Sequence, residues 1–369
     1  MKRRQFLTGA AVAGAVTTAA AVSAPAIAQS GGPQIRWRLA SSFPKSLDTI
    51  YGAAEFMAKR VSDATGGRFQ IQVFAAGEIV PAFQVADAVQ ANTVEMGHTA
   101  SYYFVGKDPT FAIDTAIPFG LNARQQSAWM YFGGGRALMN EFFKEYNIYG
   151  IPCGNTGAQM GGWFNKEIKT VDDLKGLKFR VGGFAGQVLA KLGVVPQQIP
   201  GGDIYPALEK GTIDAAEWVG PYDDEKLGFN KVAKFYYYPG WWEGGPQLSA
   251  YVNTTKWAEL PSEYKAVLEA ACADANSWML AKYDAQNPAA LRRLVGSKTM
   301  KLLPFPRAVM QACYDAAQEL YAETSAANPK FKKVYTSWKT FLDSQNQWFR
   351  VAENTYDNFN QNARPTKKS

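Results

Sequence analysis

The chain has 369 residues, of which 47% are apolar, and this length corresponds to about two domains with full hydrophobic cores. Its formal net charge is +7, but the basic residues are scattered and three of them lie within the first four positions. Because the sequence has no basic stripe and no zinc-finger or basic-helix pattern, we do not expect it to bind nucleic acid.

Residues 1–28 have the form of a cleaved export signal. A basic start with two adjacent arginines is followed by a weakly apolar, Ala-rich run and by AIA at 26–28, where small residues mark a cleavage site. The RRQFL motif indicates the twin-arginine route. A membrane anchor is the alternative, but such a run is weakly apolar for bilayer insertion. We therefore expect a periplasmic protein that begins near Gln29.

Histidine and cysteine are scarce. Cys153, Cys272 and Cys313 show no CxxC spacing, so each is expected to be a packed structural residue. His98 is the only histidine, and the chain has no GxSxG motif to accompany it. We expect His98 to be structural or part of a pocket wall, and a secreted hydrolase is disfavoured.

The first part of the chain predicts a β-α-β unit. Residues 35–39 alternate as a half-buried strand, 47–64 carry apolar residues at helical spacing, and 69–74 (FQIQVF) alternate again. This order implies parallel pairing with a right-handed crossover. Since ligands of such sheets lie at the carboxyl ends of the strands, the loop 41–46 (SSFPKS) is a candidate pocket wall.

A helix over 81–92 leads to a strand that ends at His98, and Tyr102 and Tyr103 follow it. These tyrosines are either core aromatics or residues whose hydroxyls reach a ligand. One or two helices then precede the strand YGIPCG at 149–154.

A second α/β segment begins at Asn155 and centres on the short strand KFRV (178–181), which has Arg180 near its end. Glu217 and Trp218 follow another short strand, and Gln159 lies upstream in the motif NTGAQ. An arginine fork beside an amide, a carboxylate and an indole suits a small carboxylate ligand, because the fork donates two parallel hydrogen bonds.

The aromatic run 235–242 interrupts the alternation of predicted strands and helices in this second segment. Trp241 and Trp242 are expected to be a packing cluster or part of a site, and Glu243 among them requires a cation to offset its burial. The strand 247–253 is expected to return to the first sheet. Helices follow from 254, with a short strand over 299–305 and long amphipathic helices over 307–362.

Long irregular motifs, among them GNTGAQMGGWF, LKFRVGGFAGQVLAKLG and YYYPGWWEGGP, resemble the extracytoplasmic solute-binding proteins of tripartite ATP-independent periplasmic (TRAP) transporters, the DctP family. The sequence is most similar to the α-keto acid-binding members. The resemblance implies a two-lobed α/β fold with a cleft that closes on its ligand. The implied parts are a first lobe (29–154 with 245–310), a second lobe (155–244), and C-terminal helices (311–369) that pair subunits into a dimer.

The resemblance also implies the site. Arg180 would clamp the ligand carboxylate, and Gln159, Glu217 and the Trp218 carbonyl would hold a bridging cation, usually sodium, although calcium accepts the same oxygen ligands. Glu243 matches a further pocket carboxylate and a candidate ligand of the cation. The remaining ligand-lining positions are Asn155, Tyr102, Tyr103 and Phe184.

The expected function is therefore capture of a small 2-oxo acid such as pyruvate and its delivery to membrane permease subunits, without catalysis. A 2-hydroxy acid such as lactate stays open as the ligand. A sensor that signals to a membrane kinase would share the same pocket and stays open as well.

Overall fold

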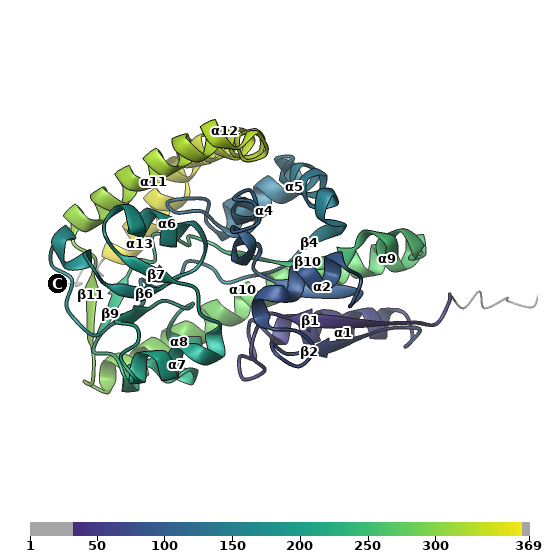
Figure 1. Cartoon of the computed structure of the whole chain (residues 1–369), viewed down its shortest axis with the longest axis horizontal. Coiled ribbons are helices and arrows are strands. Elements are labelled where there is room, and N and C mark those ends of the chain that lie inside the picture. The colour runs from purple at the N-terminus through teal and green to yellow at the C-terminus, as the bar shows by residue number, and fades with distance from the viewer. Residues whose placement is uncertain (1–31, 364–369) are drawn as a thin grey trace, which may run out of the picture. The chain divides into compact units, whose positions relative to one another are not determined.

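The structure is a computed structural model that describes residues 32–363, so the predicted export signal at 1–28 lies outside the described residues. Two β-sheets with their helices, followed by a helical C-terminal region, make up this part of the chain (Figure 1). No helix within it has the length and apolar character needed to cross a membrane.

The first sheet has the strand order β2-β1-β3-β10-β4. Strands β1 and β2 pair in parallel, as the β-α-β pattern predicts, and β10 runs antiparallel between β3 and β4. The predicted return of residues 247–253 to this sheet is therefore confirmed. The strands are β1 (Ile35–Ser41), β2 (Phe69–Phe74), β3 (Met96–Thr99), β4 (Ile148–Asn155) and β10 (Gln247–Asn253).

The helices connected to this sheet are short. The helix predicted over 47–64 begins only at Gly52, because residues 47–51 form turns whose side chains bond elsewhere. Helix α2 packs closely on β3, where a Cβ at Gly97 would lie 2.5 Å from a Val85 methyl carbon. The helices are α1 (Gly52–Ala64), α2 (Val85–Gln90), α3 (Phe111–Thr115), α4 (Ala123–Phe132) and α5 (Gly135–Phe143), with 3₁₀ turns at Ala82–Gln84 (η1), Ser101–Phe104 (η2) and Lys144–Tyr146 (η3).

The second sheet has the order β11-β9-β5-β8-β6-β7. Strand β6 lies between β7 and β8 and is parallel to both, whereas β5 pairs antiparallel with β8 and β9. Sequence periodicity missed β5 and β9, because they are short and aromatic-rich and show no regular alternation of buried and exposed residues. The strands are β5 (Trp163–Phe164), β6 (Lys178–Arg180), β7 (Val195–Gln197), β8 (Ala215–Ala216), β9 (Phe235–Tyr238) and β11 (Lys301–Pro304).

Short helices connect the strands of the second sheet. The predicted cap of the turn at 171–174 is present, since Thr170 and Asp173 form a capping box. The helical segments are η4 (Val171–Leu174), α6 (Gly183–Lys191), α7 (Gly201–Glu209), α8 (Pro221–Lys226) and η5 (Phe229–Lys231). Strand β11 pairs with β9 and so belongs to this sheet, although the predicted division assigns residues 245–310 to the first lobe.

Five helices complete the described chain: α9 (Thr254–Glu259), α10 (Ser262–Gly296), α11 (Arg307–Ala327), α12 (Pro329–Val351) and α13 (Glu353–Asn362). Helix α10 contacts α1 and β4 of the first sheet and also α8 of the second segment. Helix α11 packs on α6 and α12 on α4 and α5, so the C-terminal helices also contact elements of both sheets (Figure 1).

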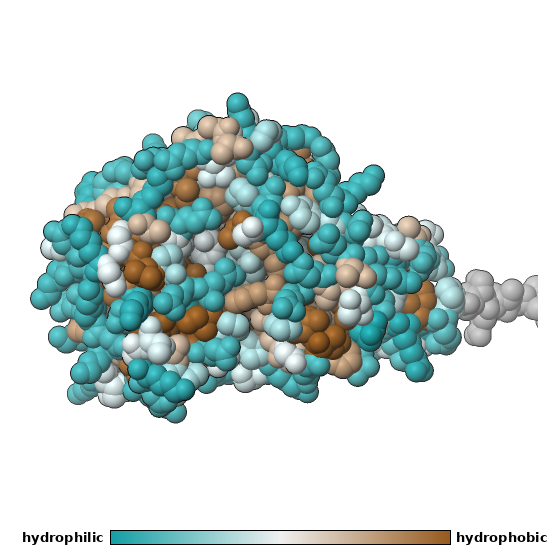
Figure 2. All heavy atoms as spheres, viewed as in Figure 1, coloured by the Kyte–Doolittle hydropathy of each residue, from teal (hydrophilic) through white to brown (hydrophobic). Residues whose placement is uncertain are grey.

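The predicted structural cysteines are confirmed as buried free thiols, at Cys153, Cys272 and Cys313. On the face seen in Figure 2, apolar residues lie in separate patches within a largely hydrophilic surface. Most large apolar side chains instead belong to one buried hydrophobic cluster that includes residues of both sheets and of the C-terminal helices.

Candidate functional site

Arg180 ends strand β6, and its side chain is 1% exposed. Its Nε donates to the Ile199 carbonyl at 3.0 Å, and its Nη1 donates to the Glu217 carbonyl at 2.7 Å and to Glu217 Oε1. The guanidinium lies 5.0 Å from the Trp218 ring centroid. Nη2 has no hydrogen-bond partner within residues 32–363. Protein acceptors thus hold Nε and Nη1 of the guanidinium, whereas the N–H groups of Nη2 are unpaired within the described residues.

Glu217 lies beside Arg180 because β6 and β8 are parallel neighbours, with Arg180 paired to Ala216. Two residues whose strands end together at one sheet edge are brought side by side, although 37 positions separate them in the chain. Glu217 Oε1 also accepts from the Gly182 amide at 3.0 Å. Its other oxygen, Oε2, is buried and has no partner in the described chain.

Gln159 and Glu243 meet through their backbones, since the Gln159 amide donates to the Glu243 carbonyl at 3.1 Å. In the Gln159 side chain, Nε2 donates to Thr156 Oγ1 at 3.2 Å, so the side-chain oxygen Oε1 points away from Thr156. Gln159 Oε1 and Glu243 Oε2 are both buried and unpaired within residues 32–363. With Glu217 Oε2, three buried acceptor oxygens therefore lack a donor, a costly arrangement unless something binds them.

The pKa shifts of the Glu217 and Glu243 carboxyl groups also favour a bound cation. Burial raises the pKa of Glu217, and the Arg180 guanidinium offsets this only in part. Burial and then repulsion from Glu217 raise the pKa of Glu243 well above its usual range, and the Arg180 guanidinium offsets this only in part. Two buried carboxylates share one buried guanidinium, so an added cation would restore the charge balance.

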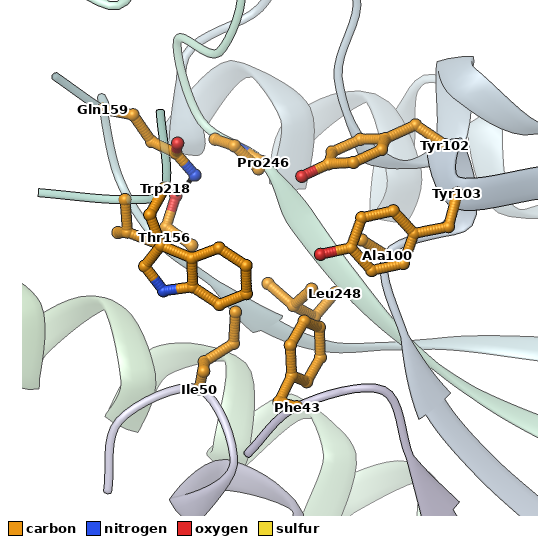
Figure 3. A pocket seen from close by; sticks show the side chains of 11 residues that line it. Phe43, Ile50, Ala100, Tyr102, Tyr103, Thr156, Gln159, Trp218, Pro246 and Leu248 are labelled. Carbon is orange, nitrogen blue, oxygen red and sulfur yellow. Dashed lines mark hydrogen bonds between the residues drawn. The ribbon is translucent and has the colours of Figure 1, made fainter. Parts of the chain in front are cut away.

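A small pocket lies next to these residues. Figure 3 shows Gln159 and Trp218 on one side, and the hydroxyls of Tyr102 and Tyr103 pointing at them from the other. Its enclosed volume is about 10 Å³, roughly the space of one water molecule. Burial raises the pKa of Tyr103 to about 12, so its hydroxyl keeps its proton and can donate. The other lining residues are Phe43, Ile50, Ala100, Thr156, Val219, Pro246 and Leu248.

Close packing fixes the Trp218 side of the pocket. A Cβ at Gly201 would lie 2.5 Å from Trp218 Cη2, so only glycine fits where α7 begins. The Val219 carbonyl accepts from the Met160 amide at 3.0 Å, which links the segment after β8 to the segment that carries Gln159. The 217–219 backbone is therefore held from both sides.

Five predicted site residues are not among the residues that line this pocket: Arg180, Glu217, Glu243, Asn155 and Phe184. Asn155, at the end of β4, donates to the Gly245 carbonyl and accepts from the Gly157 amide, both at 2.9 Å. Phe184, on α6, packs against Tyr321 and Phe331 of the C-terminal helices. In this structure Asn155 shapes the loop that leads to Gln159, and Phe184 joins α6 to the C-terminal helices.

Sequence reasoning missed much of the apolar wall. Phe43 belongs to the loop predicted as a pocket wall, but Ile50 and Leu248 gave no local signal, since apolar residues in turns and buried strands are common. Thr156 lies in the NTGAQ motif between Asn155 and Gln159, so this motif contained the signal for it. His98 is buried on β3 with its Nε2 3.1 Å from the Cys153 carbonyl oxygen, as expected for a structural histidine.

Within residues 32–363 no group of three or more His, Cys, Asp and Glu side chains is arranged to hold a metal ion. The unpaired buried oxygens of this region come instead from two carboxylates, Glu217 and Glu243, and from the side-chain amide of Gln159. Such a donor set fits a hard cation such as sodium or calcium, which accepts neutral oxygens, and does not fit zinc.

Comparison with known proteins identifies the family. The family model for "Bacterial extracellular solute-binding protein, family 7" (DctP) matches residues 40–328. A monocarboxylate 2-oxoacid-binding periplasmic protein of Nostoc sp. is 53% identical over 361 residues, which are 97% of this chain and 99% of the relative.

Two solved structures are similar throughout. A TRAP transporter solute-binding protein of Bordetella bronchiseptica, a mixed-occupancy dimer with calcium and picolinate in one active site, has 55% identity and a TM-score of 0.88 over 89% of this chain and 98% of that one. One from Pseudoalteromonas atlantica, with bound sodium and pyruvate, has 42% identity and a TM-score of 0.85 over 88% and 98%.

These matches confirm the expected two-lobed α/β fold and the expectation of a binding protein rather than an enzyme. The chain belongs to the DctP family of bacterial extracellular solute-binding proteins.

Proposed function

We propose that this protein captures a small 2-oxo monocarboxylate, such as pyruvate, together with a bridging cation, and delivers it to a TRAP membrane permease. The observation that carries the proposal is the set of unpaired buried atoms, Arg180 Nη2 with three acceptor oxygens from Gln159, Glu217 and Glu243. A carboxylate and a cation, bound side by side, would satisfy both kinds of unpaired group at once.

In this proposal Arg180 Nη2 donates to the ligand carboxylate. Gln159 Oε1, Glu217 Oε2 and the Trp218 carbonyl hold the cation, with Glu243 as a further ligand or pocket carboxylate. The cation attracts the 2-oxo oxygen next to the carboxylate, which is how a keto acid would be distinguished from a plain acid. Tyr102 and Tyr103 contact the ligand from the opposite side. For Asn155 and Phe184, a ligand contact stays a prediction.

The relatives support the ligand class. The Nostoc relative is named for 2-oxo acids, and the similar structure from Pseudoalteromonas atlantica holds pyruvate with sodium. The apolar wall formed by Phe43, Ile50 and Leu248 has no cation for a second carboxylate, which favours monocarboxylates over dicarboxylates. Sodium and calcium are both retained as candidates, since the relatives hold either ion.

The wider proposal covers export, lobes and assembly. Residues 1–28 would direct twin-arginine export to the periplasm. The lobes would be 29–154 with 245–310 and 155–244, except that β11 pairs with β9 and so belongs with the second lobe, and they would close on the ligand as periplasmic binders do. The C-terminal helices of 311–369 would join two subunits, and the dimeric relative supports this.

Calorimetric titration of the mature protein tests the ligand and the cation. We expect pyruvate and 2-oxobutyrate to bind more tightly than lactate, succinate should not bind, and removal of sodium and calcium should weaken 2-oxo acid binding strongly. Equal binding of pyruvate with and without added cation would contradict the cation role, and tighter binding of lactate would move the ligand class to 2-hydroxy acids. Mass spectrometry of the recovered ligand should find it unchanged.

The transport partner needs a separate test. Co-purification of the ligand-loaded protein with a TRAP permease pair in membranes is expected. Binding of the ligand without any permease association would favour a sensor for a membrane kinase instead.

A further inference from the structure

A second cluster of buried polar residues lies behind the pocket and has no role in the ligand contacts described above. Asp223, on α8, is fully buried, and its two oxygens have different partners. Thr49 Oγ1 donates to Asp223 Oδ1 at 2.7 Å, and the Tyr283 hydroxyl donates to Asp223 Oδ2 at 2.6 Å. Thr49 lies in the turns between β1 and α1, and Tyr283 lies on α10, so three separate elements meet at one carboxylate.

The residue next to Thr49 repeats this arrangement nearer the surface. Asp48 pairs with Lys226 of α8 and with Lys282 of α10, the latter at 2.8 Å. Lys282 also donates to the Asp48 carbonyl at 2.7 Å. Because Asp48 is half exposed, its ion pairs are screened and weak, and the buried Asp223 contacts matter more. We call Asp48, Thr49, Asp223, Lys226, Lys282 and Tyr283 the Asp223 cluster.

Two of the three chain segments that meet in the Asp223 cluster continue directly into the pocket wall. Ile50 follows Thr49, and Trp218 and Val219 precede α8, whose first residue is Pro221. Figure 3 shows Ile50 close below Trp218. The Thr49–Asp223 hydrogen bond therefore joins the wall contributed by the first-sheet side to the wall contributed by the second-sheet side.

The chemistry of Asp223 makes this contact demanding. A buried carboxylate is costly unless its oxygens receive hydrogen bonds, and the Thr49 and Tyr283 hydroxyls each donate one to Asp223. Loss of the Thr49 hydroxyl would leave Oδ1 without its donor. The carboxylate would then gain by moving toward water, and that movement would draw α8 and the preceding Trp218–Val219 wall away from the Thr49–Ile50 turn.

We infer that Asp223 is a positioning residue, which holds the Trp218–Val219 wall against Ile50 and thereby slows escape of the bound ligand. This inference rests on the proposed ligand binding at Arg180 and adds a determinant of residence time outside the ligand contacts. Substitutions that loosen a pocket wall are expected to act mainly on the dissociation rate, since association rates vary much less among variants of one binding site.

Thr49→Val and Thr49→Ser form the decisive pair, because valine keeps the shape without the hydroxyl and serine keeps the hydroxyl. Stopped-flow measurements with pyruvate and sodium should give a dissociation rate at least about tenfold faster for Thr49→Val and near the parent value for Thr49→Ser, with association rates within about threefold. Tyr283→Phe, which removes the other donor, should also speed dissociation.

Thr324→Val is the matched control, since the Thr324 hydroxyl bonds only a carbonyl of its own helix, at 2.7 Å. It should leave both rates unchanged. An unchanged dissociation rate in a folded Thr49→Val protein would overturn the inference and leave the proposed function standing, and so would an equal effect of Thr324→Val. If the parent protein binds no 2-oxo acid, the proposed function is wrong and the inference falls with it.

Discussion

At the scale of single residues, the site is organised around the Arg180 guanidinium, of which two nitrogens are already hydrogen-bonded to the protein. Nε and Nη1 of Arg180 are held by Ile199 and Glu217, so the direction in which Nη2 points is fixed before any ligand arrives. A donor that needs no reorientation loses little conformational freedom on binding. The unpaired oxygens of Gln159, Glu217 and Glu243 are the corresponding acceptors, which are available to ligate a cation.

Arg180→Lys tests the fork. Lysine keeps the positive charge near Glu217 but cannot donate in parallel to Glu217, Ile199 and a ligand carboxylate, so we expect pyruvate affinity to fall at least about 100-fold with the fold retained. Calorimetry measures the affinity and circular dichroism the fold. Arg293→Lys, at a surface pair with Glu225, is the control and should bind normally. Parent-like affinity of Arg180→Lys would rule out the proposed clamp.

Glu217→Gln tests the cation. The amide keeps the shape and an oxygen, but it loses the charge that attracts a cation, so the sodium concentration for half-maximal pyruvate binding should rise at least about tenfold. At saturating sodium the pyruvate affinity should recover in large part. Titration of sodium at fixed pyruvate measures this. Glu209→Gln, on the exposed end of α7, should have no effect. An unchanged sodium requirement in Glu217→Gln would remove Glu217 from the cation site.

At the scale of elements, the site depends on strand order. Arg180 and Glu217 meet because β6 and β8 lie side by side and end together. Gln159 meets Glu243 because β5 and β9 pair antiparallel, so the segment before β5 lies beside the segment after β9. Helix α8 then begins two residues after Val219 and brings the carboxylates Asp223 and Asp224 beneath this edge. Asp224 accepts from Tyr236 at 2.7 Å and from Trp163 at 3.0 Å.

Asp224→Asn tests how this buried carboxylate affects stability. Burial raises the pKa of Asp224 from 3.8 to about 7, so between these values the folded protein binds a proton that the unfolded chain has released. The free energy of unfolding should therefore decrease as pH rises through this window, by up to about 4 kcal/mol from this group. Asp224→Asn should flatten that decrease.

Denaturant titrations between pH 4 and pH 8 measure the slope for the parent protein and for Asp224→Asn. Asp63→Asn, which removes a surface pair with Lys59, is the control and should follow the parent curve. If Asp224→Asn and the parent lose stability with the same slope, Asp224 does not take up the proton.

At the scale of the whole molecule, the C-terminal helices carry apolar side chains that the rest of residues 32–363 leaves exposed. Trp348 is 58% exposed, Tyr356 68% and Phe359 73%, whereas the earlier part of α12 packs on α4 and α5. Large exposed aromatics on one helical segment are typical of a protein interface. Together with the dimeric relative, this supports the proposed pairing of subunits.

Removal of these side chains should separate the subunits. In a Trp348→Ser, Tyr356→Ser and Phe359→Ser variant we expect a monomer by light scattering at concentrations where the parent is a dimer, because the interface loses most of its large apolar surface. Pyruvate binding should persist, since the site residues lie in one chain. A replacement of Tyr238, another exposed aromatic, by serine should leave the dimer intact. A dimeric triple variant would place the interface elsewhere.

Much of the fold could be predicted from the sequence, for identifiable reasons. Residues 69–74 alternate regularly and form β2 with the predicted bounds, and the strand at 247–253 returned to the first sheet as expected. Strands β5 and β9 were missed, because two to four aromatic residues carry no period that separates a buried strand from a packing cluster. The late start of α1 also had no local cause, since Thr49 bonds to Asp223, a residue 174 positions away.

The sequence by itself determined the family, the residue types of the site and the strand ends that carry Arg180 and Glu217, because these depend on local patterns and on long motifs. Only the tertiary structure decided which polar atoms are left without partners, that Phe184 packs against the C-terminal helices, and that Asp223 joins two walls of the pocket. The physical reason is that hydrogen-bond satisfaction and burial are properties of contacts between residues far apart in the chain, and neither composition nor periodicity records such contacts.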